Sequence, residues 1–189
     1  DLLALMMGSE GMLGMVVEVV VKLLPRPHTT RVLMAAFDDV EKAARAVASI
    51  IAEGIIPSGL EMMDNAVIRA AEDFIGAGYP TAAQAMLLCE LDGYEADVLT
   101  QLDIVDGLLQ NSGAISVQPA ANAQEAERFW SGRKNAFPAM GRMAPDYFCM
   151  DGTIPRKKLG EVLRRISSLS EQYGLAVGNV FHAGDGNLH

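Results

Sequence analysis

The sequence predicts an α+β fold, with helices packed on a sheet. Strand-like apolar runs alternate with helix-like stretches from residue 31 to the end of the chain. Half of the 189 residues are hydrophobic and 21% are charged, which supplies enough apolar surface for a substantial core. Helices of this length between strands pack on a sheet, and part of the order is compatible with a β-α-β-β-α-β unit.

The first 25 residues are set apart from the rest by Pro25 and Pro27, and we predict a domain boundary there. They contain a glycine-rich stretch from Gly8 to Gly14 and then an apolar, β-branched run from Met15 to Leu24. That run predicts a buried strand. The glycine-rich stretch exposes backbone N–H groups, which suits either close approach to a phosphate or flavin or a tight turn before a strand.

Beyond this boundary the elements follow one another closely. Strands are predicted at residues 31–37, 60–63, 85–91, 114–118, 147–151 and 176–181, and helices at 40–53, 65–75, 94–111, 122–135 and 155–173. Asp64 and Asn122 suit helix N-caps, because their side chains accept from free backbone N–H groups. Gly54 and Gly174 suit helix ends, and Pro155 suits a first helical turn.

Composition excludes several classes of protein. The net charge of −9 argues against a nucleic-acid or anionic-membrane partner. Cys89 and Cys149 lie in apolar runs, so we expect buried thiols, no disulfide framework and a cytoplasmic setting. The longest apolar run is too short to span a bilayer. Because the chain begins at Asp1 and stops at His189 directly after a glycine-rich motif, we expect a piece of a longer protein.

The last eight residues, HAGDGNLH, carry the strongest functional signal. His182 and His189 are two of only three histidines, and they flank a turn that contains Gly184 and Gly186. On one straight strand the two rings would face opposite ways, but the glycines can fold the chain back and aim both at one point. Imidazoles suit Zn, Fe or Mn, although a third ligand must then come from elsewhere. The alternative is a glycine turn with two idle histidines.

Two further groups of polar residues are less specific. Arg133 and Lys134 lie near the end of a helix, where a guanidinium either binds a carboxylate bidentately or extends along the surface. Glu61 and Glu90 interrupt apolar strands, and we expect them to face solvent. The stretch from Asp151 to Pro155 is expected to be structural, as a strand end followed by a helix start.

Taken together, the motifs resemble those of the FAD-linked oxidases that act on 2-hydroxy acids, within the vanillyl-alcohol-oxidase-like flavoproteins. The resemblance is closest to the glycolate-oxidising branch. It rests on six motifs spread in order along the chain: GSEGMLG from Gly8, GLEMMDN from Gly59, CELDG from Cys89, FWSGRKNAFP from Phe129, MDGTIP from Met150 and HAGDGNLH from His182.

The resemblance implies two domains and a set of site residues. Residues 1–25 would end the FAD-binding domain, and residues 28–189 would form most of the substrate or cap domain. The fold implied for that domain is a ferredoxin-like antiparallel sheet covered by helices. The residues implied near the flavin are Gly8, Ser9, Glu10, Gly11 and Gly14. Arg133, with Lys134 and Asn187, would bind the substrate. His182 and His189 would be catalytic and would bind a divalent metal, whose third ligand would lie outside these residues.

The resemblance also implies a reaction and partners. FAD would accept hydride from glycolate or another short D-2-hydroxy acid, giving the 2-oxo acid. Other oxidase subunits, including an iron-sulfur subunit, would take the electrons onward and would provide any membrane association. D-Lactate and D-2-hydroxyglutarate stay open as substrates, as do a metal-binding module without flavin and a purely structural domain. We expect the 189 residues alone to be inactive.

Overall fold

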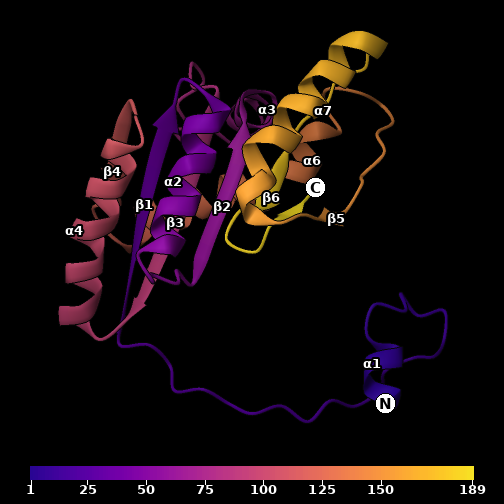
Figure 1. The fold of residues 1–189 in the computed structure, drawn as a ribbon, viewed down its shortest axis with the longest axis horizontal. Coiled ribbons are helices and arrows are strands. Elements are labelled where there is room, and N and C mark those ends of the chain that lie inside the picture. The colour runs from indigo at the N-terminus through magenta and orange to yellow at the C-terminus, as the bar shows by residue number, and fades with distance from the viewer.

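The computed structural model describes all 189 residues as a compact body with an extended N-terminal arm (Figure 1). The strands are β1 (Thr29–Phe37), β2 (Gly59–Asp64), β3 (Ala85–Gly93), β4 (Ser116–Pro119), β5 (Gly152–Thr153), β6 (Val180–His182) and β7 (Asn187–Leu188). The helices are α1 (Leu2–Met6), α2 (Val40–Ala52), α3 (Asn65–Ile75), α4 (Glu95–Asn111), α5 (Ala123–Lys134), α6 (Ala136–Met140), the 3-10 turn η1 (Arg156–Lys158) and α7 (Leu159–Tyr173).

The seven strands form one sheet in the order β4-β1-β3-β2-β6-β7-β5, and every neighbouring pair is antiparallel. The first four positions, β4-β1-β3-β2, follow the ferredoxin-like order, with α3 inserted between β2 and β3. The hairpin β6-β7 and the short β5 extend the sheet beyond β2. The predicted α+β class with an antiparallel, helix-covered sheet is therefore confirmed.

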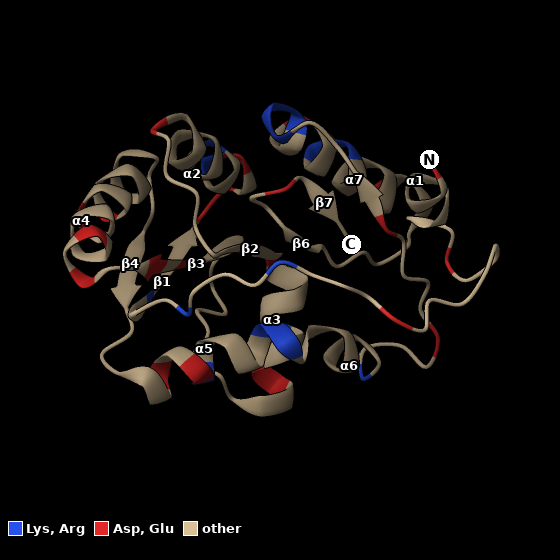
Figure 2. Ribbon diagram, turned by 90° about the horizontal axis from the view of Figure 1, so that it is seen from below, with Lys and Arg blue, Asp and Glu red and all other residues tan.

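Helices cover both faces of this sheet: α2, α4 and α7 lie on one face, and α3, α5 and α6 on the other (Figure 2). The strand β1 shows why its sequence is apolar throughout. Leu33, Ala35 and Phe37 belong to the core under α2 and α4, whereas Val32 and Met34 belong to the core under α3 and α5. Because alternate residues point to opposite faces, a strand buried on both faces is a continuous hydrophobic run.

Helix boundaries follow local capping. Asp39, Asp64 and Asn122 accept hydrogen bonds from backbone N–H groups in the first turns of α2, α3 and α5. Gly76 and Gly174 end α3 and α7 in the left-handed conformation, which glycine adopts without steric cost. None of the helices combines the length and apolar composition that crossing a bilayer requires.

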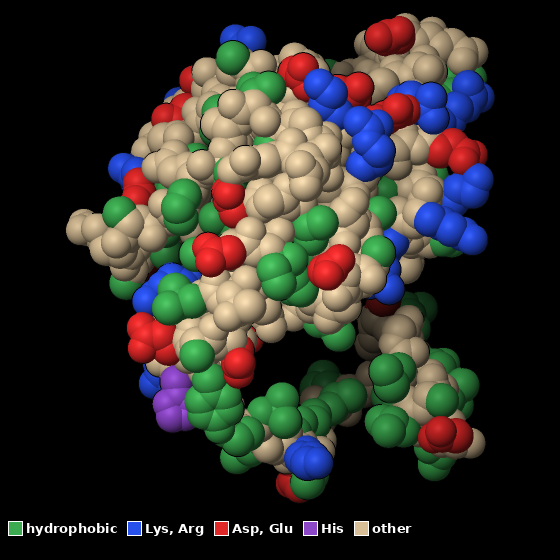
Figure 3. Space-filling view, turned by 60° about the vertical axis from the view of Figure 1, so that its left-hand side comes forward, with side chains coloured by type: hydrophobic (Ala, Val, Ile, Leu, Met, Phe, Trp, Pro, Cys, Tyr) green, Lys and Arg blue, Asp and Glu red, His purple; other side chains and the backbone are tan.

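Two predicted strands are wrong. Residues 15–24 are extended but unpaired, and their side chains are exposed along the arm (Figure 3). A strand needs a hydrogen-bonded neighbour, and the arm lies apart from the sheet. Residues 147–151 are also not a strand, because β7, the partner available at that edge, pairs with only Gly152 and Thr153. Cys149 in this loop is exposed, contrary to the prediction of a buried thiol.

Candidate active site

The terminal hairpin folds the two histidines toward each other. His182 ends β6 and stands opposite Asn187 of β7, and His189 exchanges backbone hydrogen bonds with Val180. Gly186 makes the turn with φ +79°, and a Cβ there would lie 2.2 Å from the carbonyl oxygen of Ile154. The two rings end 5.3 Å apart between centroids and nearly perpendicular, at 87°. The predicted convergence of the two rings is therefore present.

Glu61 does not face solvent, contrary to the prediction from the sequence. It stands directly opposite His182, since β2 pairs antiparallel with β6. Its Oε1 lies 2.6 Å from Nδ1 of His182, and only 8% of the residue is exposed. Instead of facing solvent, Glu61 faces the helix α5, because its neighbours Leu60 and Met62 fill the core on the other face.

Arg133 reaches the same carboxylate from α5. Its Nε donates to Oε2 of Glu61 at 2.8 Å, and its side chain is 10% exposed. The structure therefore places Arg133 in the interior beside the histidines, whereas Lys134, the next residue, is exposed and has no polar partner. The Nη groups of Arg133 make no hydrogen bond to other side chains or to the backbone, so they remain able to bind a ligand.

The C-terminal part of α5 is held on the sheet by close and specific contacts. Gly132 lets the ring of Tyr79 approach so closely that a Cβ would lie 2.2 Å from its Cζ. Two residues earlier, the indole N–H of Trp130 donates to Oε2 of Glu90 at 2.7 Å. Glu90 was also expected to face solvent, but it is half-buried and anchors α5 without contacting a histidine.

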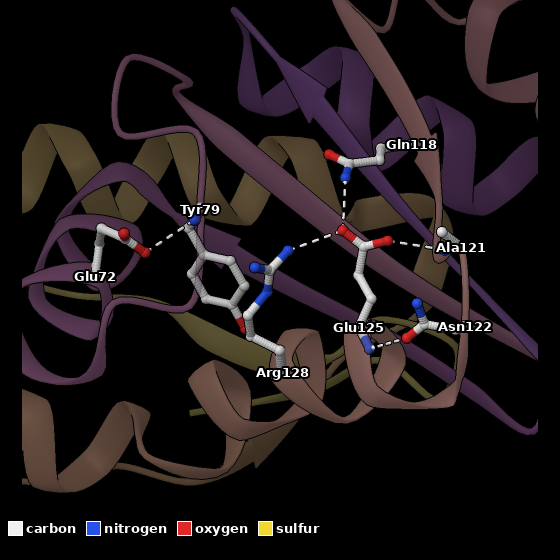
Figure 4. A network of polar contacts seen from close by, with 7 residues as sticks. All are labelled: Glu72, Tyr79, Gln118, Ala121, Asn122, Glu125 and Arg128. Carbon is white, nitrogen blue, oxygen red and sulfur yellow. Dashed lines mark hydrogen bonds and ion pairs between the residues drawn. The ribbon is translucent and has the colours of Figure 1, made fainter.

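The N-terminal part of α5 is fixed by the polar contacts drawn in Figure 4. Asn122 caps the helix by accepting from the backbone N–H of Glu125. The Glu125 carboxylate accepts in turn from the backbone N–H of Ala121, from Gln118 of β4 and from Arg128. This reciprocal cap ties α5 to the edge strand, so both ends of the helix that carries Arg133 are held.

Asp151 lies beside His189, as Glu61 lies beside His182. Oδ2 of Asp151 lies 3.5 Å from Nδ1 of His189, and Oδ1 accepts from the side-chain amide of Asn187 at 2.6 Å. Phe137 of α6 meets the His189 ring edge-on at 5.9 Å. Asp151 was expected to be structural, and its position next to the site is visible only once β5 and β7 are paired.

Each histidine therefore has a carboxylate at Nδ1 and no hydrogen-bond partner at Nε2. That arrangement is common around metal-binding histidines, where the carboxylate orients the ring. The centroid separation agrees with about 5 Å for two imidazoles on one tetrahedral ion with bonds of about 2.1 Å. These two rings supply only two ligands, and no group of three or more His, Cys, Asp or Glu side chains is arranged to hold a metal ion.

Open space adjoins the site on one side. A cavity of about 390 Å³ is lined by the end of α2, the loop before β2, β2 itself, η1 and the hairpin, among them Ser58, Glu61, Arg156, His182 and Asp185. A larger hollow of about 640 Å³ lies at the start of α5 and has no hydrophobic lining residue. The larger hollow touches none of the histidines, whereas the smaller cavity is lined in part by His182. The smaller cavity is therefore the one next to the site.

The thiols and the glycine-rich stretch lie outside this cluster. Burial raises the pKa of Cys89 to about 12, with a further contribution from Glu90, so this thiol is not a nucleophile at neutral pH. The stretch from Gly8 to Gly14 lies in the exposed arm, away from the histidines (Figure 1). Gly8, Glu10 and Gly11 have positive φ angles there, so this stretch is a sequence of turns.

Comparison with known proteins defines the class to which this fold and site belong. Residues 26–189 match the family described as FAD linked oxidases, C-terminal domain, and the chain belongs to that family. Over all 189 residues it is 64% identical to glycolate oxidase subunit GlcD of Escherichia coli K12. A D-lactate dehydrogenase from Anaerostipes hadrus is 30% identical over the whole chain.

The chain spans only part of these relatives: 38% of the length of GlcD and 41% of the D-lactate dehydrogenase. Among solved structures, an alkyldihydroxyacetonephosphate synthase superposes on 98% of this chain and 38% of its own, with a TM-score of 0.68. At 14% identity this likeness concerns the fold alone. It agrees with the helix-covered antiparallel sheet described above.

Proposed function

We propose that this chain forms the substrate-facing side of a flavoprotein active site that oxidises glycolate, or another short D-2-hydroxy acid, to the 2-oxo acid. The observation that carries the proposal is the cluster of His182, His189 and Arg133 in a member of the FAD-linked oxidases. The 64% identity to a glycolate oxidase subunit favours glycolate as the substrate. FAD, when bound, would accept the hydride that leaves the substrate Cα.

Arg133 is proposed to bind the substrate carboxylate. Its Nε is occupied by Glu61, which leaves the two Nη groups for a carboxylate, and a guanidinium presents its donors in a planar fork. Burial at 10% exposure strengthens such a contact, since little water competes for the donors. Asn187, which stands opposite His182 in the hairpin, is proposed to bind substrate as well, and exposed Lys134 would serve only a longer diacid.

His182 and His189 are proposed to face the hydroxyl group of the substrate with their Nε2 atoms. If a divalent metal, Zn, Fe or Mn, is present, these two nitrogens would bind it, with a third ligand from outside these residues. Such an ion would lower the pKa of the substrate hydroxyl and so ease removal of its proton. The chain's own contribution is orientation, because Glu61 holds the His182 ring at Nδ1 and Asp151 lies 3.5 Å from Nδ1 of His189.

The arm is proposed to belong to the FAD-binding part of the enzyme. Residues 1–25 would be its last segment, and residues 28–189 would be the substrate domain. The backbone at Gly8, Ser9, Glu10, Gly11 and Gly14 would lie against the flavin. The exposed apolar side chains from Met15 to Leu24 support this proposal, because that much apolar surface is normally covered.

We also propose a cytoplasmic enzyme whose further subunits, one of them an iron-sulfur protein, carry the electrons onward. GlcD is by name a subunit of glycolate oxidase, which supports the existence of partner chains.

The test is turnover of the full-length enzyme on glycolate, D-lactate and D-2-hydroxyglutarate, together with a flavin absorbance spectrum and a metal analysis. We expect a yellow protein that turns over glycolate fastest. Fast D-lactate turnover with inert glycolate would favour the alternative function of the 30%-identical dehydrogenase. A colourless protein that binds metal would instead indicate a metal-binding module without flavin.

A further inference from the structure

Glu61 lies between two side chains on which the proposed function depends. Its Oε1 is 2.6 Å from Nδ1 of His182, and its Oε2 is 2.8 Å from Nε of Arg133. Its side chain is only 10% exposed, whereas that of His182 is 45% exposed. The carboxylate is therefore buried and fully occupied, and the imidazole turns its free edge to the open side.

The hydrogen-bonding capacities of the three groups determine where the protons lie. An arginine side chain only donates, so the oxygen facing Arg133 must accept. A carboxylate also only accepts, so the nitrogen of His182 that faces Oε1 must carry a proton. In the neutral ring this proton sits on Nδ1, which leaves Nε2 with a free lone pair.

If Glu61 only held α5 on the sheet, its contact with Arg133 would be sufficient. Glu90, one strand away, anchors α5 through Trp130 and contacts no histidine. Glu61 anchors α5 through Arg133 in the same way, and it also stands in register with His182 across the β2–β6 pair. The second contact adds nothing to holding α5, so it needs another explanation.

We propose that Glu61 is a positioning residue that sets the tautomer of His182, keeping Nε2 as the unprotonated nitrogen, while fixing the guanidinium of Arg133 at the same site. One carboxylate thereby orients both the group proposed to meet the substrate hydroxyl side and the group proposed to bind its carboxylate. The importance for turnover rests on the function proposed above, but the tautomer itself does not.

The variant Glu61→Gln separates the two possibilities. Because Arg133 cannot accept, the glutamine carbonyl has to face Arg133, and its NH₂ then faces Nδ1 of His182. Nδ1 becomes an acceptor, so the proton moves to Nε2 and the tautomer reverses. Glu90→Gln is the matched control, since a glutamine carbonyl still accepts from Trp130 and His182 is untouched.

The measurement is a long-range ¹H–¹⁵N NMR spectrum of the metal-free full-length protein with ¹⁵N-labelled histidines, at mildly alkaline pH. The His182 signals are identified by their loss in His182→Asn. We expect the Nδ1–H tautomer in the wild type and in Glu90→Gln, and the Nε2–H tautomer in Glu61→Gln. An Nε2–H tautomer in the wild type, or no change in Glu61→Gln, overturns the proposal. If Glu61→Gln does not fold, the wild-type tautomer alone decides.

A second measurement connects the tautomer to function. In the full-length enzyme, Glu61→Gln should lower kcat by about 10- to 100-fold, the usual cost of removing a carboxylate behind an active histidine, and Glu90→Gln should not. A reversed tautomer with unchanged turnover would overturn the function proposed for His182 and leave the positioning role of Glu61 intact. An unchanged tautomer with lost turnover would overturn the proposed effect of Glu61 on the tautomer and leave the function proposed for His182 intact.

Discussion

The two halves of the sheet are held together in different ways. In the ferredoxin-like half, β4-β1-β3-β2, the strand β1 pairs with β3 over nine residues and is buried on both faces. In the hairpin half, β6-β7-β5, no strand exceeds three residues, and polar contacts such as Asn187 to Asp151 join the strands. The first half carries most of the apolar core, and the second half carries the two histidines of the candidate site. Glu61 of β2 reaches His182 from the first half, and Arg133 of α5 in turn reaches Glu61.

The largest effect on stability is expected from emptying the core of the ferredoxin-like half. Phe37 ends β1 with no exposed surface, so Phe37→Ala should lower the free energy of unfolding by about 3–5 kcal/mol in a urea titration. Phe148, which is 86% exposed, provides the matched control. Phe148→Ala should change stability by less than about 0.5 kcal/mol. Equal losses in the two variants would contradict the account of the core.

A smaller loss is expected from straining the hairpin half at its turn. Gly186 has φ +79° and no room for a Cβ, so Gly186→Ala should cost about 1–3 kcal/mol and displace the histidines. Gly184, two residues earlier, has ordinary space around its Cβ position and serves as the control. Thermal unfolding of both variants checks this. A tolerated Gly186→Ala would mean that the turn is not the one described.

The smallest effect concerns Asp64, which links the two halves. Its carboxylate caps α3 and accepts from the backbone and side chain of Asn179, just before β6. Burial raises its pKa above the ordinary value of 3.8, so the folded state holds this proton more tightly than the unfolded state. The resulting stabilisation is present below pH 3.8 and is lost as pH rises through the folded pKa.

The free energy of unfolding, measured from pH 3.5 to 7, should therefore fall with rising pH in the wild type relative to Asp64→Asn. A difference between the two proteins that stays constant with pH would show that Asp64 does not titrate in this way.

The same contrast between halves explains what the sequence alone could predict. Apolar periodicity and capping residues such as Asp64 and Asn122 placed the elements of the ferredoxin-like half within a few residues. The runs at 15–24 and 147–151 have equally apolar sequences, but a strand also needs a partner, and pairing is a long-range property. Local pattern carries no information about whether such a partner is present.

The candidate site was predictable to a similar degree. His182 and His189 stood out through their rarity and the glycines between them. Glu61 and Asp151 did not, because each becomes part of the site only through pairing with residues far away in the sequence. The signal that could have revealed Glu61 was its position: a lone carboxylate inside a strand that is otherwise buried on both faces needs a charged partner.

The most direct test of the central claim, that the two histidines of the hairpin half take part in the chemistry, is glycolate turnover of the full-length enzyme in three histidine variants. His182→Ala and His189→Ala should each lower kcat by at least about 100-fold, with unchanged flavin absorbance and Tm. His28→Ala, which removes the exposed histidine stacked on Tyr94, should keep wild-type turnover. Near-normal turnover in either His182→Ala or His189→Ala would contradict the account.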